Sequence, residues 1–90
     1  MHELRPIKFI IYQGELLIAR VDFHRELLPE EYSKGDVKGG GFAIVNSEER
    51  TLEVSGKSEE FGYYDQDLIN SVKLPKRLSG FSIIENQQYP

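Results

Sequence analysis

The stretch "VKGGGFAIV", residues 37–45, places three consecutive glycines directly before a run of β-branched and aromatic residues. Glycine loses more conformational freedom on folding than any other residue, so three in succession are costly. The run therefore predicts either a turn or a backbone that passes close to another group, such as a bound anion. The segments on either side decide between these two interpretations.

The chain around this run has the size and composition of one domain, residues 1–90, with 39% hydrophobic and 29% charged residues. It has no cysteine, which excludes disulfides and thiolate metal sites, and its two histidines disfavour a zinc site. The formal net charge of −4 disfavours nucleic acid and anionic membranes as partners. No apolar run is long enough for a membrane span, and the N-terminus is too polar for a signal peptide. We expect a cytoplasmic monomer without a cofactor.

Strands are predicted where apolar residues alternate or cluster between glycines. Residues 7–13 and 15–23 form a first hairpin around Gly14, residues 41–56 form a second hairpin around "NSEER", and residues 81–85 form a last strand. On the second strand we expect the core face to carry Leu17, Ala19, Val21 and Phe23. On the second hairpin we expect it to carry Ile44 with Leu52 or Val54.

Helices are predicted in the two remaining segments. In residues 24–35, Pro29 suits a first helical turn and Gly35 a C-terminal cap. In residues 57–80, an aspartate at 65 or 67 suits an N-cap, and Pro75 ends the element. The resulting order is ββαββαβ. It predicts an α+β (mixed α/β) domain, with a mixed sheet of about five strands and two helices.

Two side chains stand where chemistry is often located. His24 follows the second strand, and a neutral imidazole at such a junction can act as a general base. Lys8 lies on the first strand and can bind a phosphate. The alternative is that His24 is a surface residue without a role and that Lys8 is a solvated lysine on an open sheet face.

The loop "SGKSEEFG", residues 55–62, is bounded by glycines that allow backbone N–H groups to form an anion nest, to which the Ser58 hydroxyl can add a donor. The spacing is not that of a P-loop, and the alternative is an ordinary glycine-bounded loop. Two other pairs of adjacent glutamates, Glu30/Glu31 and Glu48/Glu49, are better interpreted as solvated surface residues.

Taken together, these residues resemble the Janus/Ocnus family of phosphohistidine phosphatase-like proteins. "KFII" from Lys8 corresponds to the family's first strand, and "VDFH" places an aromatic residue before His24, as around the family's catalytic histidine. The glycine run and "LEVSGKSEEFG" correspond to a G-x-S-x-x-[YF]-G loop that follows a GGG strand. The resemblance covers nearly the whole chain, with shorter insertions before residue 39.

The resemblance implies a phosphohistidine phosphatase-like fold and metal-independent phosphoryl hydrolysis, on a phosphohistidine-containing protein or a small phosphorylated substrate. In this interpretation His24 is the general base, Lys8 binds phosphate oxygens, and the Ser58 hydroxyl with the backbone N–H groups of Ser58 and Glu60 cradles the phosphate. The glycines would let the third strand pass close to this site.

The chain departs from the family pattern at three positions. Phe42 stands where the family tends to carry an anion-binding arginine, and Glu59 and Glu60 stand where it has uncharged residues. A carboxylate about 6 Å from a phosphate dianion costs roughly 1.4 kcal/mol even in water. The alternative function is therefore a catalytically inactive binding module on the same fold, with exposed aromatics such as Tyr63 and Tyr64 in its contact surface. A core role for one of these two tyrosines is equally plausible.

Overall fold

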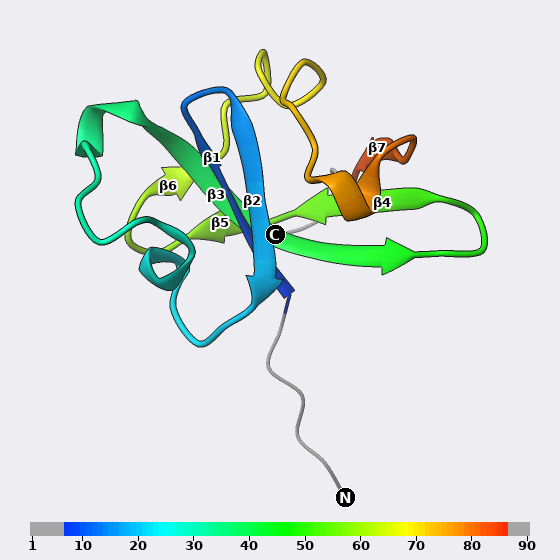
Figure 1. The fold of residues 1–90 in the computed structure, drawn as a ribbon, viewed down its shortest axis with the longest axis horizontal. Helices are drawn as coiled ribbons and strands as arrows, with labels where there is room; N and C mark the ends of the chain where they lie inside the picture. The colour runs from blue at the N-terminus through cyan, green and yellow to red at the C-terminus, as the bar shows by residue number, and fades with distance from the viewer. Residues whose placement is uncertain (1–6, 87–90) are drawn as a thin grey trace, which may run out of the picture.

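The computed structural model describes residues 7–86, which form one mixed sheet (Figure 1). Its strands are β1 (Ile7–Tyr12), β2 (Glu15–Arg20), β3 (Val37–Asn46), β4 (Thr51–Ser55), β5 (Lys57–Ser58), β6 (Gly62–Tyr63) and β7 (Ser82–Glu85). Short 3₁₀ turns lie at His24–Leu27, Lys34–Asp36 and Lys76–Leu78. The main path through the sheet is β2-β1-β3-β4-β7, and the short β5 and β6 join it through β3.

Both predicted hairpins and the last strand are confirmed. β1 and β2 pair antiparallel around a two-residue turn, Gln13 and Gly14, in which both residues have positive φ as a tight hairpin requires. β3 and β4 pair antiparallel around the polar loop that follows Asn46. β7 pairs parallel with β4, so the chain between them crosses over the sheet.

The predicted α+β class with two helices is wrong, because the described residues contain 3₁₀ turns in place of α-helices. In residues 24–35, Pro29 forces the preceding residue, Leu28, into an extended conformation (ψ 153°), so the first turn ends there. The segment that follows forms only the short 3₁₀ turn Lys34–Asp36 before β3 begins. The order ββαββαβ and the fold implied by the resemblance are therefore wrong as well.

The second predicted helix is replaced by turns. The Asp65 carboxylate does accept backbone N–H bonds from Asp67 and Leu68, as a cap would. The turn does not propagate: the following Asn, Ser, Val and Ile add little helix propensity, so packing against the rest of the chain decides the path. Beyond them, the backbone of Lys73 bonds to Gly14 and Leu16 beside β2.

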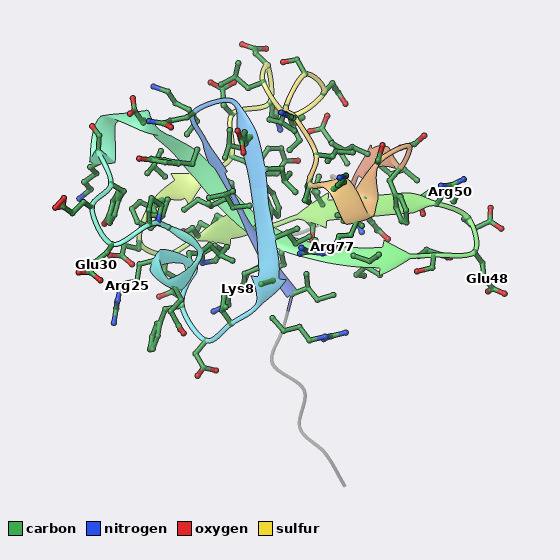
Figure 2. The ribbon with its side chains drawn as sticks, in the orientation of Figure 1. Lys8, Arg25, Glu30, Glu48, Arg50 and Arg77 are labelled. Atoms are coloured by element: carbon green, nitrogen blue, oxygen red, sulfur yellow. The ribbon has the colours of Figure 1, made fainter. Side chains whose placement is uncertain are left out.

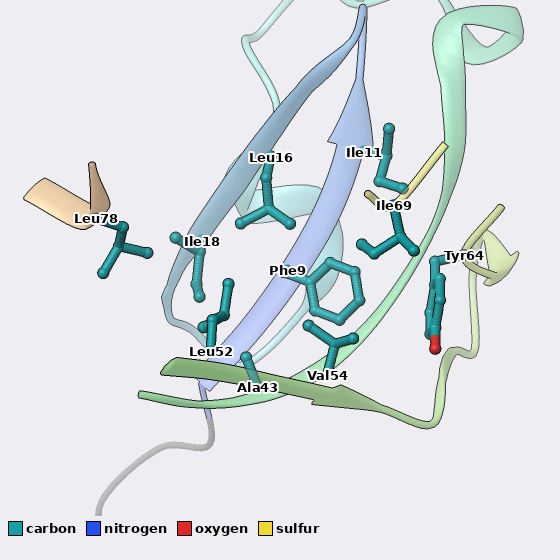
Figure 3. Close-up of a cluster of buried hydrophobic side chains, with 10 residues drawn as sticks. All are labelled: Phe9, Ile11, Leu16, Ile18, Ala43, Leu52, Val54, Tyr64, Ile69 and Leu78. Carbon is teal, nitrogen blue, oxygen red and sulfur yellow. The ribbon is translucent and has the colours of Figure 1, made fainter. Parts of the chain in front are cut away.

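The core lies on one face of the sheet (Figure 3). Phe9 faces Ile18 and Ile11 faces Leu16 across the first hairpin. Ala43, Leu52 and Val54 join them from the second hairpin, and Tyr64, Ile69 and Leu78 cover them from the segment after β6. The Tyr64 ring lies 5.5 Å from that of Phe9, and its hydroxyl donates to Glu85 Oε1 at 2.9 Å. Burial, together with that carboxylate, raises the pKa of Tyr64 to about 12.

Two predictions about which side chains face the core are wrong. On β2 the core residues are Leu16 and Ile18; Leu17 and Ala19 are half-buried on the other face, and the strand ends before residues 21–23. Both faces of β2 are partly covered, so its apolar residues run continuously and do not mark one face. On β3, Ala43 is buried and Ile44 is exposed. The prediction for Leu52 and Val54 is confirmed.

Candidate functional site

A cleft of about 510 Å³ opens on the face of the sheet opposite the core. Lys8 of β1 and Phe42 of β3 are paired across the two strands and point to this face, because Phe9 and Ala43 beside them point to the core. The segment after β2 and the loop around β5 form the two sides. The lining residues are Lys8, Asp22, Phe23, His24, Phe42, Gly56, Lys57, Glu59, Glu60 and Tyr63.

The structure brings three of the four predicted site residues to this cleft: Lys8, His24 and Glu60. Ser58, the fourth, is 1% exposed and does not line it. Its Oγ accepts the backbone N–H of Phe61 at 3.0 Å, which holds the loop in its turn behind the cleft wall. In this structure, then, Ser58 shapes the loop, and the side chains of its neighbours face the cleft.

His24 is 6% exposed and is held by the glycine strand. Its Nε2 lies 2.8 Å from the carbonyl oxygen of Gly41. A carbonyl only accepts, so Nε2 donates its proton, and in the neutral ring the lone pair sits on Nδ1. Nδ1 has no hydrogen-bond partner among residues 7–86, where no buried side-chain nitrogen or oxygen is left unpaired, so solvent reaches it.

The charge state of His24 follows from the same packing. Burial lowers the pKa of His24 below its ordinary value of 6.5, and the nearby Lys8 charge acts in the same direction. The hydrogen bond to Gly41 and the charge of Glu60 oppose this shift without reversing it. The ring is therefore neutral near pH 7, its orientation is fixed through Nε2, and Nδ1 is not enclosed by the protein.

The three glycines make this packing possible, and they lie within β3, not in a turn. A Cβ at Gly40 would lie 2.3 Å from the carbonyl oxygen of Phe9 and 3.2 Å from Cδ2 of His24. Gly39 has a φ of +81°, and a Cβ there would lie 1.9 Å from the carbonyl oxygen of Tyr63 in β6. The close-approach interpretation is confirmed: the glycines let β3 lie against β1, β6 and the imidazole at once.

Lys8 occupies the centre of an aromatic cluster. Its Nζ donates to the backbone carbonyl of Asp22 and lies 6.0 Å and 5.8 Å from the ring centroids of Phe23 and Phe42. The Phe42 ring also meets His24 edge-on, at 5.7 Å between centroids. Cation–π contact of this kind holds an ammonium group at a defined point. Lys8 thus stands in the cleft beside the imidazole.

Charges of both signs line the cleft. Lys8 and Lys57 face Asp22, Glu59 and Glu60, so two positive charges against three negative give a sum of −1 with His24 neutral. Arg25 stands at the rim, where its Nη1 lies 3.8 Å from Glu60 Oε1. Both side chains of this pair are well exposed, so the pair contributes little to stability.

The sequence analysis did not identify Asp22, Arg25 or Lys57 as part of the site. For Arg25 the sequence did contain a signal, the tripeptide "FHR" of residues 23–25 after the second strand. In it an aromatic ring precedes the histidine and a guanidinium follows it. Between Ile7 and Asn86 no three His, Asp or Glu side chains group as metal ligands. No helix among those residues is long and apolar enough to cross a membrane.

Comparisons of the chain with protein-family models, with curated proteins and with solved structures give no match. The resemblance to the Janus/Ocnus family, the phosphatase activity and the proposed partners therefore stay predictions.

Proposed function

We propose that this cleft binds a phosphorylated substrate in the cytoplasm and hydrolyses it with His24 as general base. The observation that carries the proposal is the open Nδ1 of a neutral, oriented imidazole in the same cleft as the Lys8 ammonium. The proposal rests on this site alone, because the fold differs from the one the resemblance implied.

In the proposed reaction, Lys8 binds phosphate oxygens and Nδ1 of His24 accepts a proton from water. The water oxygen forms the new P–O bond as the bond to the leaving group breaks. The proton then passes from the imidazolium to the leaving group, which returns His24 to its neutral form. A positioned general base of this kind typically contributes about 10²–10⁴-fold to a rate.

The proposal is tested by incubating a phosphohistidine peptide, without added metal, with the native protein and with His24→Gln. The phosphate released from the peptide is measured for each. The glutamine amide can still donate to the Gly41 carbonyl, so the variant removes the base and keeps the packing. We expect kcat to fall by about 100-fold or more. The urea midpoint shows whether the variant is folded, and a folded variant with undiminished release would refute the proposal.

A second candidate function is a non-catalytic binding module, and the carboxylates favour it. Glu59 and Glu60 both line the cleft, and the summed charge there is negative, which weakens phosphate binding. This candidate predicts no phosphate release from the native protein. It also predicts that ligand binding changes in Glu59→Gln and not in His24→Gln. Titration of both variants with the same ligand separates the two functions.

A further inference from the structure

The exposed aromatic side chains of the molecule gather at the cleft. Among residues 7–86, the large hydrophobic side chains that are exposed include three aromatic ones, Phe23, Phe42 and Tyr63, at 54%, 37% and 69%. All three line the cleft. Exposing an aromatic ring to water is unfavourable in free energy. The concentration of such rings at one site therefore indicates contact with a ligand.

One guanidinium of this chain already lies at the edge of this surface. The guanidinium of Arg25 lies over the ring of Phe23, with its central carbon 4.7 Å from the ring centroid, and its Nη1 lies 3.8 Å from Glu60. A planar cation that stacks on a ring and forms an ion pair with a carboxylate is a recurrent arrangement for guanidinium groups. Arg25 at the rim is thus an internal example of it.

The lining of the cleft holds the same two kinds of partner for a group from outside. Phe42 and Tyr63 supply exposed rings, each with a lysine ammonium near it (Lys8 at 5.8 Å and Lys57 at 5.5 Å from the ring centroids), and Glu59 supplies a carboxylate. A carboxylate only accepts hydrogen bonds, so the complementary group is a donor or a cation. In the proposed function, Lys8 and His24 hold a phosphoryl group in the same cleft. The ligand therefore combines a phosphoryl group with a planar donor.

We propose that the substrate is an N-phosphorylated guanidine, such as the side chain of phosphoarginine. This inference rests on the proposed function and names its substrate class. The phosphoryl group lies at Lys8 and His24, and the guanidine stacks on Phe42 or Tyr63 and donates to Glu59. Such a substrate brings its own positive charge to the acidic side of the cleft, so the carboxylates that repel a simple phosphate attract this one.

The reaction in this proposal is hydrolysis of the P–N bond. Water adds to phosphorus and the P–N bond breaks, while the proton taken by His24 passes to the leaving nitrogen. The products are inorganic phosphate and a free guanidinium, so atoms and charge balance without a further reactant. The guanidine carries one positive charge in the substrate and in the product, so Glu59 contributes to binding and orienting the leaving group.

The test compares two labile phosphoryl compounds, phosphoarginine and acetyl phosphate, because acetyl phosphate has no donor or cation for Glu59. Phosphate release is measured with the native protein, with Glu59→Gln and with Glu48→Gln. Glu48 is exposed in the loop between β3 and β4, and Figure 2 shows it at the far tip of that hairpin, away from Lys8 and Arg25. It controls for the loss of one negative charge.

We expect Glu59→Gln to lower kcat/KM for phosphoarginine by about tenfold, the size of a charge-assisted hydrogen bond. The same variant should raise kcat/KM for acetyl phosphate, because a repelling charge is removed. Glu48→Gln should change neither value. Equal changes for both substrates in Glu59→Gln would overturn the inference.

Failure of the inference is distinguishable from failure of the proposed function. If acetyl phosphate is hydrolysed in a His24-dependent way and phosphoarginine is not hydrolysed, the proposed function stands and the substrate class is wrong. If neither compound is hydrolysed, or if His24→Gln has no effect on either, the proposed function is wrong and the inference with it.

Discussion

The two faces of strand β1 are stabilised by different kinds of contact. On one face Phe9 and Ile11 are fully buried among apolar side chains from both hairpins and from the segment after β6 (Figure 3). On the other face Lys8 lines an open cleft, and Ile10 lies opposite Gly40, whose missing side chain makes room for the imidazole of His24. The core face is stabilised by apolar area, whereas the cleft face depends on a few close backbone contacts.

The largest effect is expected on the core face. Phe9→Ala removes a fully buried ring from the centre of the cluster and should lower the free energy of unfolding by about 3–5 kcal/mol. The matched change on the cleft face, Phe42→Ala, removes a ring that is 37% exposed and should cost less than about 1 kcal/mol. Urea unfolding measures both. Similar losses in the two variants would contradict the distinction between the faces.

A smaller effect is expected from a single methyl group on the cleft face. Gly40→Ala places a Cβ against the Phe9 carbonyl and the His24 ring, and overpacking of this kind should cost about 1–3 kcal/mol. The control is Gly35→Ala, where nothing lies within 4 Å of the added Cβ and stability should be unchanged or slightly higher. The NMR resonances of His24 should move only in Gly40→Ala. Unchanged His24 resonances there would show that the imidazole does not pack on Gly40.

The smallest effect is a pH dependence confined to the cleft face. The pKa of His24 is lowered in the folded chain, so as the pH falls below 6.5 the unfolded chain binds a proton before the folded chain does. The contribution of His24 to the free energy of unfolding is therefore fully present above pH 6.5. It is lost as the pH falls from 6.5 toward the lowered pKa. Urea midpoints at about pH 7.5 and about pH 5.5 should differ more for the native protein than for His24→Gln. Parallel pH profiles would refute a neutral, buried His24.

The parts of this fold that the sequence predicted are those decided by local patterns. The first hairpin follows from apolar residues on either side of Gly14, and the second from those around a polar loop, so near neighbours contain the information. The second helix could not be rejected in the same way, because a capping residue, Asp65, is followed by apolar residues at helical spacing, Leu68, Ile69 and Val72. Whether a capped turn continues depends on packing against distant residues, which a local pattern does not contain.

The candidate site was predictable to the extent that it lies at strand ends. Lys8 and His24 were identified from their positions on or after strands, and the structure places both at one cleft. The burial of Ser58 was not predictable, because a serine in a glycine-bounded loop is equally suited to bind a ligand or to bond its own backbone. The Gly41 carbonyl was missed because no side chain marks a backbone acceptor.

The division between the two faces also has a consequence for the order of folding during synthesis. Every residue that lines the cleft lies between Lys8 and Tyr63, whereas the cover of the core, with Tyr64, Ile69 and Leu78, is synthesised later. A nascent chain that has reached only Tyr63 carries the complete set of cleft residues on a sheet whose apolar face is bare. The apolar face of such a sheet stays in contact with water until the residues after Tyr63 cover it. The ribosome therefore completes the list of cleft residues before it supplies the cover of the core beneath them.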